Sequence, residues 1–362
     1  MANNVLRDAS QRRPRDDSHV DAGVRVHPRP PFEARRADIQ RWWGRGVKGF
    51  WWPDHLMAFA SRALWSDDSA AAVEDTRLHA YTDPFVSIAA CADAVPDALL
   101  GICVTDAVRR MPATLVQAAM TLDHLAPGRI VLGLGAGEPA NYVPYAWSVP
   151  SPSRRLIEAA AAIRAFLDDP GPDARGGVVG LRPPSGSPGP RLWMAAHGPR
   201  GLEATGRYAD GWIPTSLDPP AWATARATVL EAAVRHGRDP ARITMALSAN
   251  VVLAGGHEAA HALLEHPAIR LHALLLSDEA FARHGAAHPL GRAGLHARVS
   301  RTTGQPPTPC PSNRERSISR HPKLSLPLLA GQLGVAPVGE LQLCSRWCGV
   351  AQRRRLDPLF GM

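Results

Sequence analysis

Short apolar segments alternate with amphipathic helical patterns along most of this 362-residue chain, and this alternation restricts the fold more than any other feature. The alternation begins near residue 21 and continues to about residue 291. Strands and helices that follow one another in this way are typical of a parallel sheet covered by helices. The sequence therefore predicts an α/β protein, and about 250 residues are enough for one (β/α)8 barrel.

Seven strand and helix units are visible, and a helix can be outlined in five of them. The predicted strands are short apolar runs that end at Pro, Gly or a polar residue. They cover residues 24–26, 49–52, 99–105, 129–135, 192–196, 212–214 and 243–253. The predicted helices have apolar residues at intervals of three and four. They cover residues 32–43, 113–122, 155–167, 199–208 and 222–236.

The eighth unit, which would close a barrel, is not recognisable. Pro, Ser and Arg dominate the chain after Gly291, and prolines interrupt every window there. The sequence therefore predicts a TIM (β/α)8-type barrel in residues 21–291 that is incomplete at its C-terminus. Residues 1–20 are polar, and we expect them to be disordered. Residues 292–362 form a basic Pro/Ser/Arg-rich tail, for which disorder and out-of-frame sequence are the two hypotheses.

The net positive charge of the chain comes entirely from that tail. Residues 292–362 contain eleven Lys or Arg and three acids, which leaves thirty of each kind in residues 1–291 and accounts for the net charge of +8. A basic tail on a neutral body is typical of a solvated appendage, so we expect no nucleic-acid partner.

No run of about 18 apolar residues or signal peptide is present, so we expect no membrane span and a cytoplasmic location. Five cysteines without a repeated spacing predict reduced thiols.

Two ionisable residues, Asp54 and His55, follow the second predicted strand. Reactive groups of a parallel barrel lie at the carboxyl ends of its strands. The pKa of a histidine is ordinarily close to neutral pH, so His55 is a candidate to orient or protonate a substrate oxygen. The alternative is an Asp that caps a turn and a His that packs in the core.

A glycine-rich segment follows the strand at 129–135. Gly135, Gly137 and Ala140 have the spacing of a dinucleotide-binding motif, and Glu138 and Asn141 lie in the same segment. That motif requires a helix to begin within it, whereas the prolines of this segment predict an extended loop. Two alternatives to a dinucleotide site remain: glycines that let another ligand approach the backbone, and a plain Gly-rich turn.

Small residues and hydroxyl groups follow three other strands. The small residues after the third strand allow a flat ring to lie against the backbone. After the fifth strand a helix begins, and the free N–H groups of its first turn suit a phosphate. The sixth strand adds hydroxyl donors. The residues concerned are Cys103, Val104 and Thr105, then Ala196, His197, Gly198 and Pro199, and finally Thr215 and Ser216.

The chain contains fifteen histidines, but we expect no metal site. His284 and His288 lie beside Gly285 and Pro289, with no acid or Cys at ligand spacing.

These strand ends together resemble the luciferase-like superfamily, and within it the reductases that use the 5-deazaflavin coenzyme F420. Several matching stretches in one order are far more specific than any single motif. They are WWPDHL (51–56), LGICVTDAVRR (100–110), GRIVLGLGAGE (128–138), AAHGPR (195–200), TGRYADGWIP (205–214) and HGAAHPLG (284–291).

The resemblance implies hydride transfer from reduced F420 to a carbonyl, and the expected substrate is a small-molecule or lipid ketone. It places Asp54 and His55 beside the deazaflavin, and Glu138 where related enzymes have a proton-transferring carboxylate. Cys103 and Val104 fall at a bulge behind the ring. Residues 196–199, 215 and 216 match the region around the coenzyme phosphate.

Two other functions are compatible with the resemblance. One is an FMN-dependent monooxygenase of the same superfamily, and the other is a truncated, non-catalytic barrel. A homodimer is a further expectation. The family continues past the segment at 284–291 into an eighth strand, whereas this sequence changes abruptly at Arg292.

Overall fold

Seven parallel strands form one sheet, with each strand hydrogen-bonded to the next along the chain. The computed structural model describes residues 21–26, 28–57, 80–147, 150–169, 176–215, 217–249, 251–254 and 335–337, and scattered positions from 256 to 287. The strands are β1 (Gly23–Arg25), β2 (Gly49–Trp52), β3 (Leu99–Asp106), β4 (Ile130–Gly135), β5 (Arg191–Met194), β6 (Gly211–Trp212) and β7 (Thr244–Met245).

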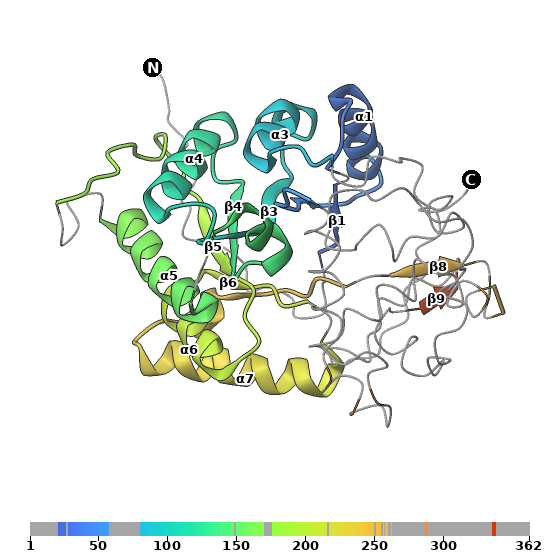
Figure 1. The fold of residues 1–362 in the computed structure, drawn as a ribbon. Helices are drawn as coiled ribbons and strands as arrows, with labels where there is room; N and C mark the ends of the chain where they lie inside the picture. Colours follow the sequence, from blue (N-terminus) through green and yellow to red (C-terminus); the bar gives the residue numbers. More distant parts are fainter. Residues whose placement is uncertain are drawn as a thin grey trace, which may run out of the picture.

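Helices cover the outer face of the sheet and surround the strands in an arc (Figure 1). They are α1 (Phe32–Trp43), α3 (Pro84–Cys91), α4 (Pro112–Leu125), α5 (Pro152–Asp168), α6 (Pro199–Tyr208) and α7 (Pro219–Arg235). All of them except α1 have a proline in the first turn. The first N–H groups of a helix have no partner within it, so a proline there removes no hydrogen bond.

The main core lies between the strands and these helices. Phe50 and Leu100 are fully buried there, and Trp52 is 1% exposed. These residues pack in one cluster with Ile88 of α3 and Val116 of α4. Alternate strand residues face the opposite side, so one face of the sheet contacts helices and the other faces the inside of the barrel.

Two tryptophans fill the inside of the barrel. The rings of Trp51 and Trp193 lie 5.0 Å apart between centroids. A Cβ atom on Gly101 would lie only 2.3 Å from the Trp51 ring, and one on Gly211 only 2.6 Å from Trp193. Glycine is therefore required at both positions because each indole lies flat across the neighbouring strand.

The sheet curls into a half-barrel. Arg25 of β1 donates a hydrogen bond to the Ser248 hydroxyl, which follows β7, at 3.1 Å. Among the described residues, no eighth strand joins this sheet. A separate pair of parallel strands consists of β8 (Val252–Ala254) and β9 (Val335–Pro337). Segment 1–20 and all of 292–362 except β9 lie outside the described residues.

Two predictions about the elements were wrong. The run 243–253 is not one strand: β7 covers only Thr244 and Met245, an isolated bridge follows between Ser248 and Thr215, and β8 pairs with β9 in a different sheet. The prediction also missed α3, whose sequence PFVSIAAC is apolar on most sides and shows no helical period. Its start is marked instead by Asp83, whose carboxylate accepts hydrogen bonds from two backbone N–H groups of the first turn.

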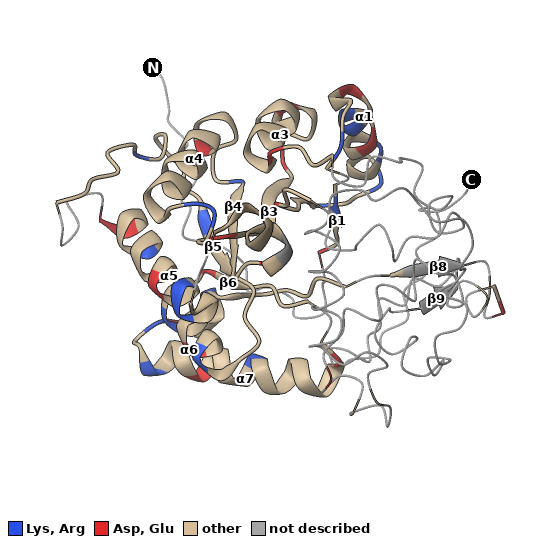
Figure 2. Cartoon of the chain, in the orientation of Figure 1, with Lys and Arg blue, Asp and Glu red and all other residues tan. Residues whose placement is uncertain are grey.

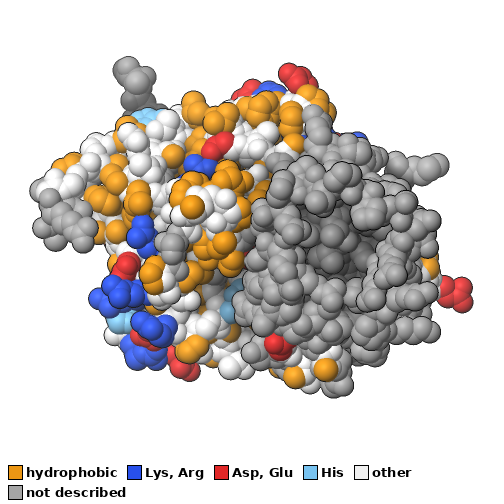
Figure 3. All heavy atoms as spheres, viewed as in Figure 1, with side chains coloured by type: hydrophobic (Ala, Val, Ile, Leu, Met, Phe, Trp, Pro, Cys, Tyr) orange, Lys and Arg blue, Asp and Glu red, His pale blue; other side chains and the backbone are white. Residues whose placement is uncertain are grey.

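Acidic and basic side chains are interleaved on helices α5, α6 and α7 (Figures 2 and 3). Arg164 contacts Asp210 at 3.0 Å. Arg235 and His236 at the end of α7 both contact Glu203 of α6. This face therefore carries both signs of charge.

Among the helices that the structure describes, none is long and apolar enough to cross a membrane.

Candidate active site

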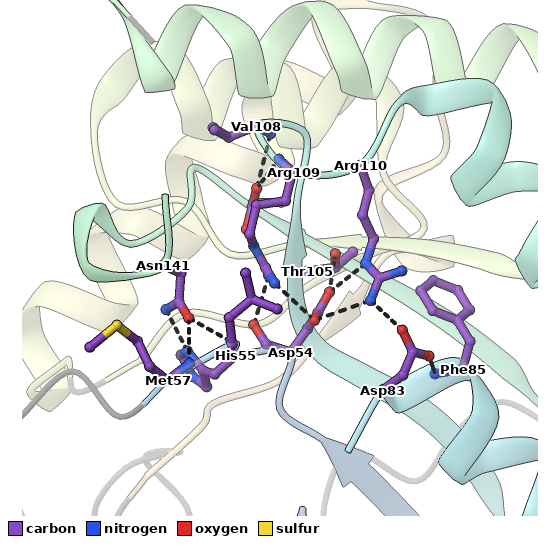
Figure 4. Close-up of polar contacts among 12 residues, drawn as sticks. Asp54, His55, Met57, Asp83, Phe85, Thr105, Val108, Arg109, Arg110 and Asn141 are labelled. Carbon is purple, nitrogen blue, oxygen red and sulfur yellow. Dashed lines mark hydrogen bonds and ion pairs between the residues drawn. The ribbon is translucent and has the colours of Figure 1, made fainter. Parts of the chain in front are cut away.

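A buried carboxylate, Asp54, organises the mouth of the barrel beside β2 (Figure 4). Its side chain is 2% exposed, and its oxygens accept hydrogen bonds from Thr105 Oγ1 at 2.6 Å, Arg109 Nη1 at 3.1 Å and Arg110 Nε at 2.9 Å. The two guanidinium groups hold the pKa of Asp54 below its usual value against the opposing effect of burial. Asp54 is therefore an anion that ties the end of β2 to the loop after β3.

Arg109 is the most enclosed cation of this network. Its side chain is 5% exposed and contacts Asp54 and, through Nε at 2.7 Å, Asp106. It also donates to the backbone carbonyl of Asp54 at 2.7 Å. Arg110 extends the network to Asp83 at 2.6 Å, and so to the start of α3. Buried charges are stable only when they are paired in this way, so the network fixes the backbone immediately before His55.

His55 is held from the other side by Asn141, in the loop after β4 (Figure 4). The distance from Asn141 Nδ2 to His55 Nδ1 is 2.8 Å. Asn141 Oδ1 accepts hydrogen bonds from the backbone N–H groups of Leu56 at 2.8 Å and Met57 at 3.4 Å. The Tyr81 ring packs edge-on against the imidazole, with 5.4 Å between centroids.

Burial lowers the pKa of His55 to about 4, and the positive charge of Arg109 acts in the same direction. The negative charge of Asp54 opposes this shift, and Arg25 adds a smaller lowering effect from β1. His55 is therefore a neutral imidazole at neutral pH.

A bulge interrupts β3 next to this pair. The pairing between β3 and β4 shifts between Ile102 and Thr105, and the Cys103–Val104 peptide bond is cis. A Cβ atom on Gly135 would lie 2.7 Å from Val104 Cγ2, so this glycine makes room for the bulge. Gly137 has a φ of +86°, a conformation that favours glycine at a turn.

The start of α6 forms the far side of the mouth. Residues 197–200 are exposed, and a Cβ atom on Gly198 would meet no other atom within 4 Å. His197 Nε2 lies 3.1 Å from the carbonyl oxygen and 3.3 Å from the amide nitrogen of Thr215. The ends of β5 and β6 are therefore joined here, in an exposed position.

Comparison with known proteins assigns the family. A model described as luciferase-like monooxygenase matches residues 14–307. The chain belongs to the luciferase-like monooxygenase family. A phthiodiolone/phenolphthiodiolone dimycocerosates ketoreductase of Mycobacterium bovis is 36% identical over 280 residues, which cover 74% of this chain and 73% of the relative. An F420-dependent hydroxymycolic acid dehydrogenase of Mycobacterium tuberculosis is 32% identical over 181 residues, or 46% of this chain and 50% of the relative.

Solved structures support the same fold. An F420-dependent secondary alcohol dehydrogenase, in complex with an F420-acetone adduct, superposes with a TM-score of 0.55 at 20% identity and covers 67% of this chain and 73% of the other. The F420-dependent tetrahydromethanopterin reductase of Methanopyrus kandleri gives 0.56 at 18% identity, covering 79% and 83%. The predicted α/β barrel and the resemblance to this superfamily are thus confirmed.

Four of the predicted site residues take part in the hydrogen bonds around Asp54 and His55. Asp54, Thr105 and His55 with Asn141 are linked by the hydrogen bonds described above. Glu138 is exposed and lies at the start of the 3-10 turn Pro139–Asn141. A second 3-10 turn, Val143–Tyr145, follows, so the segment predicted as an extended loop is partly helical. Ser216 lies outside the described residues, and the roles of all these residues stay predictions.

The sequence reading missed the cations of the site. Arg109 and Arg110 lie in a matched stretch, but local patterns give them no role, because Asp54, which both of them contact, lies 55 and 56 positions earlier in the chain. The sequence does contain a signal for them. An acid, Asp54, follows β2, a second acid, Asp106, ends β3, and the two arginines come shortly after Asp106. Carboxyl ends of adjacent parallel strands meet at one edge of a sheet, where such charges pair.

Proposed function

We propose that the protein is an oxidoreductase that uses F420 to reduce the carbonyl group of a small-molecule or lipid ketone. The observation that carries the proposal is the half-buried His55, held by Asp54 and Asn141 at the strand ends of a luciferase-like barrel. The identity of 36% over 280 residues to ketoreductases supports the reaction type and a lipid substrate. The F420-dependent relative supports the coenzyme.

The residues of the mouth fit a deazaflavin with a charged tail. The bulge at Cys103 and Val104 makes the β3 surface irregular at the point where the ring is expected, and Gly135 of β4 leaves room for the Val104 side chain. The exposed first turn of α6 presents backbone N–H groups, and Gly198 leaves open space in front of them. A helix N-terminus favours an anion, so residues 196–199 would hold the phosphate. Reduced F420, when bound, supplies the hydride.

The chain's own residues then bind and polarise the ketone. His55 contacts the substrate oxygen, and Glu138 provides the carboxyl group for proton transfer. The Asp54 network keeps the His55 backbone in place. A correctly placed acid or base accelerates a reaction by about a hundredfold to ten thousandfold, so loss of Glu138 should slow turnover without abolishing it.

In the test, purified protein is mixed with reduced F420, a long-chain ketone is added, and the oxidation of F420 is followed. We expect oxidation that depends on the ketone, and Glu138→Gln should lower kcat by about 10² to 10⁴. Glu158→Gln is the matched control, because Glu158 is an exposed acid on α5 that pairs only with Arg154 in the described contacts. A protein that binds no F420 would refute the proposal.

The same experiment separates the alternatives. An FMN-dependent monooxygenase would bind FMN in place of F420 and consume oxygen. A non-catalytic barrel would bind neither and oxidise nothing. A homodimer stays a prediction, which sedimentation of the purified chain tests directly.

A further inference from the structure

The orientation of the Asn141 amide is determined by its partners. Two backbone N–H groups, from Leu56 and Met57, donate to one end of this amide, so that end is the oxygen. The other end is then the NH2 group, and it lies 2.8 Å from His55 Nδ1. An amide NH2 group can only donate, so Nδ1 must accept and carries no proton.

A neutral imidazole has one protonated nitrogen and one bare nitrogen. With Nδ1 bare, the proton of His55 is on Nε2. The groups around the ring disfavour a second proton. Arg109 and Arg25 are cations that face it from β3 and β1, Tyr81 packs on it as a neutral ring, and Asp54 is the acid that counteracts them. The Asp54 charge is already shared by both arginines that follow β3.

We propose that Asn141 is a positioning residue that fixes His55 in its Nε2–H form, so that His55 donates a hydrogen bond to the substrate oxygen and is not the source of the proton for it. This inference rests on the proposed reduction of a ketone. When hydride adds to the carbonyl carbon, the C=O π bond breaks and its electron pair moves to the oxygen. The oxygen then takes one proton, from a carboxylic acid or water, while His55 keeps its own.

Nuclear magnetic resonance of the 15N-labelled full-length chain tests the tautomer without any assay of activity. Two-bond 1H–15N correlations distinguish a ring protonated on Nδ1 from one protonated on Nε2, and the His55→Gln variant identifies the His55 signals. At pH 7 we expect His55 to be neutral with the proton on Nε2, and to titrate near pH 4. A charged ring, or a proton on Nδ1, would overturn the inference.

The Asn141→Asp variant reverses the hydrogen bond while keeping the shape of the side chain. A carboxylate still accepts from Leu56 and Met57, but it can only accept from His55. The proton should therefore move to Nδ1, and the titration of His55 should rise by about one unit or more, because an added carboxylate favours the imidazolium. Gln117→Glu makes the same chemical change on the exposed face of α4 and should leave the His55 signals unchanged. An unchanged tautomer in Asn141→Asp would contradict the inference.

The pH profile of the two enzymes gives a second readout. In the wild type, kcat should not depend on His55 protonation between pH 5.5 and 8, since His55 stays neutral. In Asn141→Asp, the bare Nε2 cannot donate, so kcat should fall about 10²-fold or more at pH 8, as for loss of an oxyanion donor. It should partly recover at lower pH, because protonation restores Nε2–H. If the wild type oxidises no reduced F420, the proposed function fails while the resonance experiment still decides the tautomer.

Discussion

The two histidines at the barrel mouth are held in contrasting ways. The Nδ1 atom of His55 faces the NH2 group of Asn141, whose own orientation is fixed by two backbone N–H groups. The Nε2 atom of His197 faces both the carbonyl oxygen and the amide nitrogen of Thr215. One nitrogen cannot donate to the first and accept from the second at the same time, so the contact leaves the tautomer of His197 undetermined.

The surroundings of His55 are also held more firmly than those of His197. Near His55, the strands β2, β3 and β4 have four to eight residues, and their loops are joined by buried ion pairs. His197 follows β5, which has four residues like β2, but the neighbouring strand β6 has only two. Long strands and paired charges define the position of a side chain, so the first region is suited to contact the reacting atoms. The second is suited to grip a part of the coenzyme that does not react.

The largest expected effect concerns the buried ion pairs of the His55 region. The Asp54→Ala variant leaves Arg109 buried without one of its acids, and we expect the free energy of unfolding to fall by about 3–5 kcal/mol. The measurement is urea unfolding at pH 7. The matched control is Glu203→Ala on α6, whose acid pairs with Arg235 at the surface and should contribute about 1 kcal/mol or less. Equal losses in the two variants would show that burial does not distinguish the regions.

A second expected effect is a loss of stability in mild acid that depends on His55. The pKa of His55 is about 4 in the folded protein and about 6.5 in the unfolded chain. Between these values the unfolded state binds a proton that the folded state does not. The free energy of unfolding should therefore decrease as the pH falls from about 6.5 to 4, by up to about 3 kcal/mol. Below pH 4 this loss is complete, because both states then bind the proton.

The His55→Gln variant isolates this contribution. The difference in unfolding free energy between wild type and variant should change across pH 4–6.5 and be constant above it. Asp54 acts in a lower window, because its pKa is depressed and its contribution is lost only below the usual range of an aspartate. A difference that stays constant from pH 7 to 4 would mean that His55 titrates alike in both states.

The sequence allowed prediction of where the site lies but not of how it is held. Asp54 and His55 could be located because reactive groups follow the strands of a parallel barrel. The cations could not be assigned, since the contact of Arg110 with Asp54 joins residues 56 positions apart. Local patterns carry no information on such pairs.

Gly135 shows a different limit of local sequence patterns. Close approach of a ligand is one of the explanations that the sequence offers for Gly135. In the structure the atom nearest to a Cβ on Gly135 is Val104 Cγ2 of the neighbouring strand, and contact with a ligand stays a prediction. A glycine in the sequence reports that space is limited near the backbone, but not which group occupies that space. The strand at 243–253 was mispredicted for a related reason, because the length of a strand depends on the neighbour that pairs with it.

The smallest expected effect concerns His197. Its side chain is exposed, and either contact to Thr215 can be replaced by water, so His197→Ala should change the free energy of unfolding by about 0.5 kcal/mol or less. Under the proposed function, the same variant should raise KM for F420 while kcat stays unchanged, because a group that contacts only the non-reacting part of a coenzyme contributes equally to the ground and transition states. Steady-state kinetics at saturating ketone measure both constants. A fall in kcat like that of Asn141→Asp would contradict this division of roles, since it would place His197 beside the reacting atoms with His55.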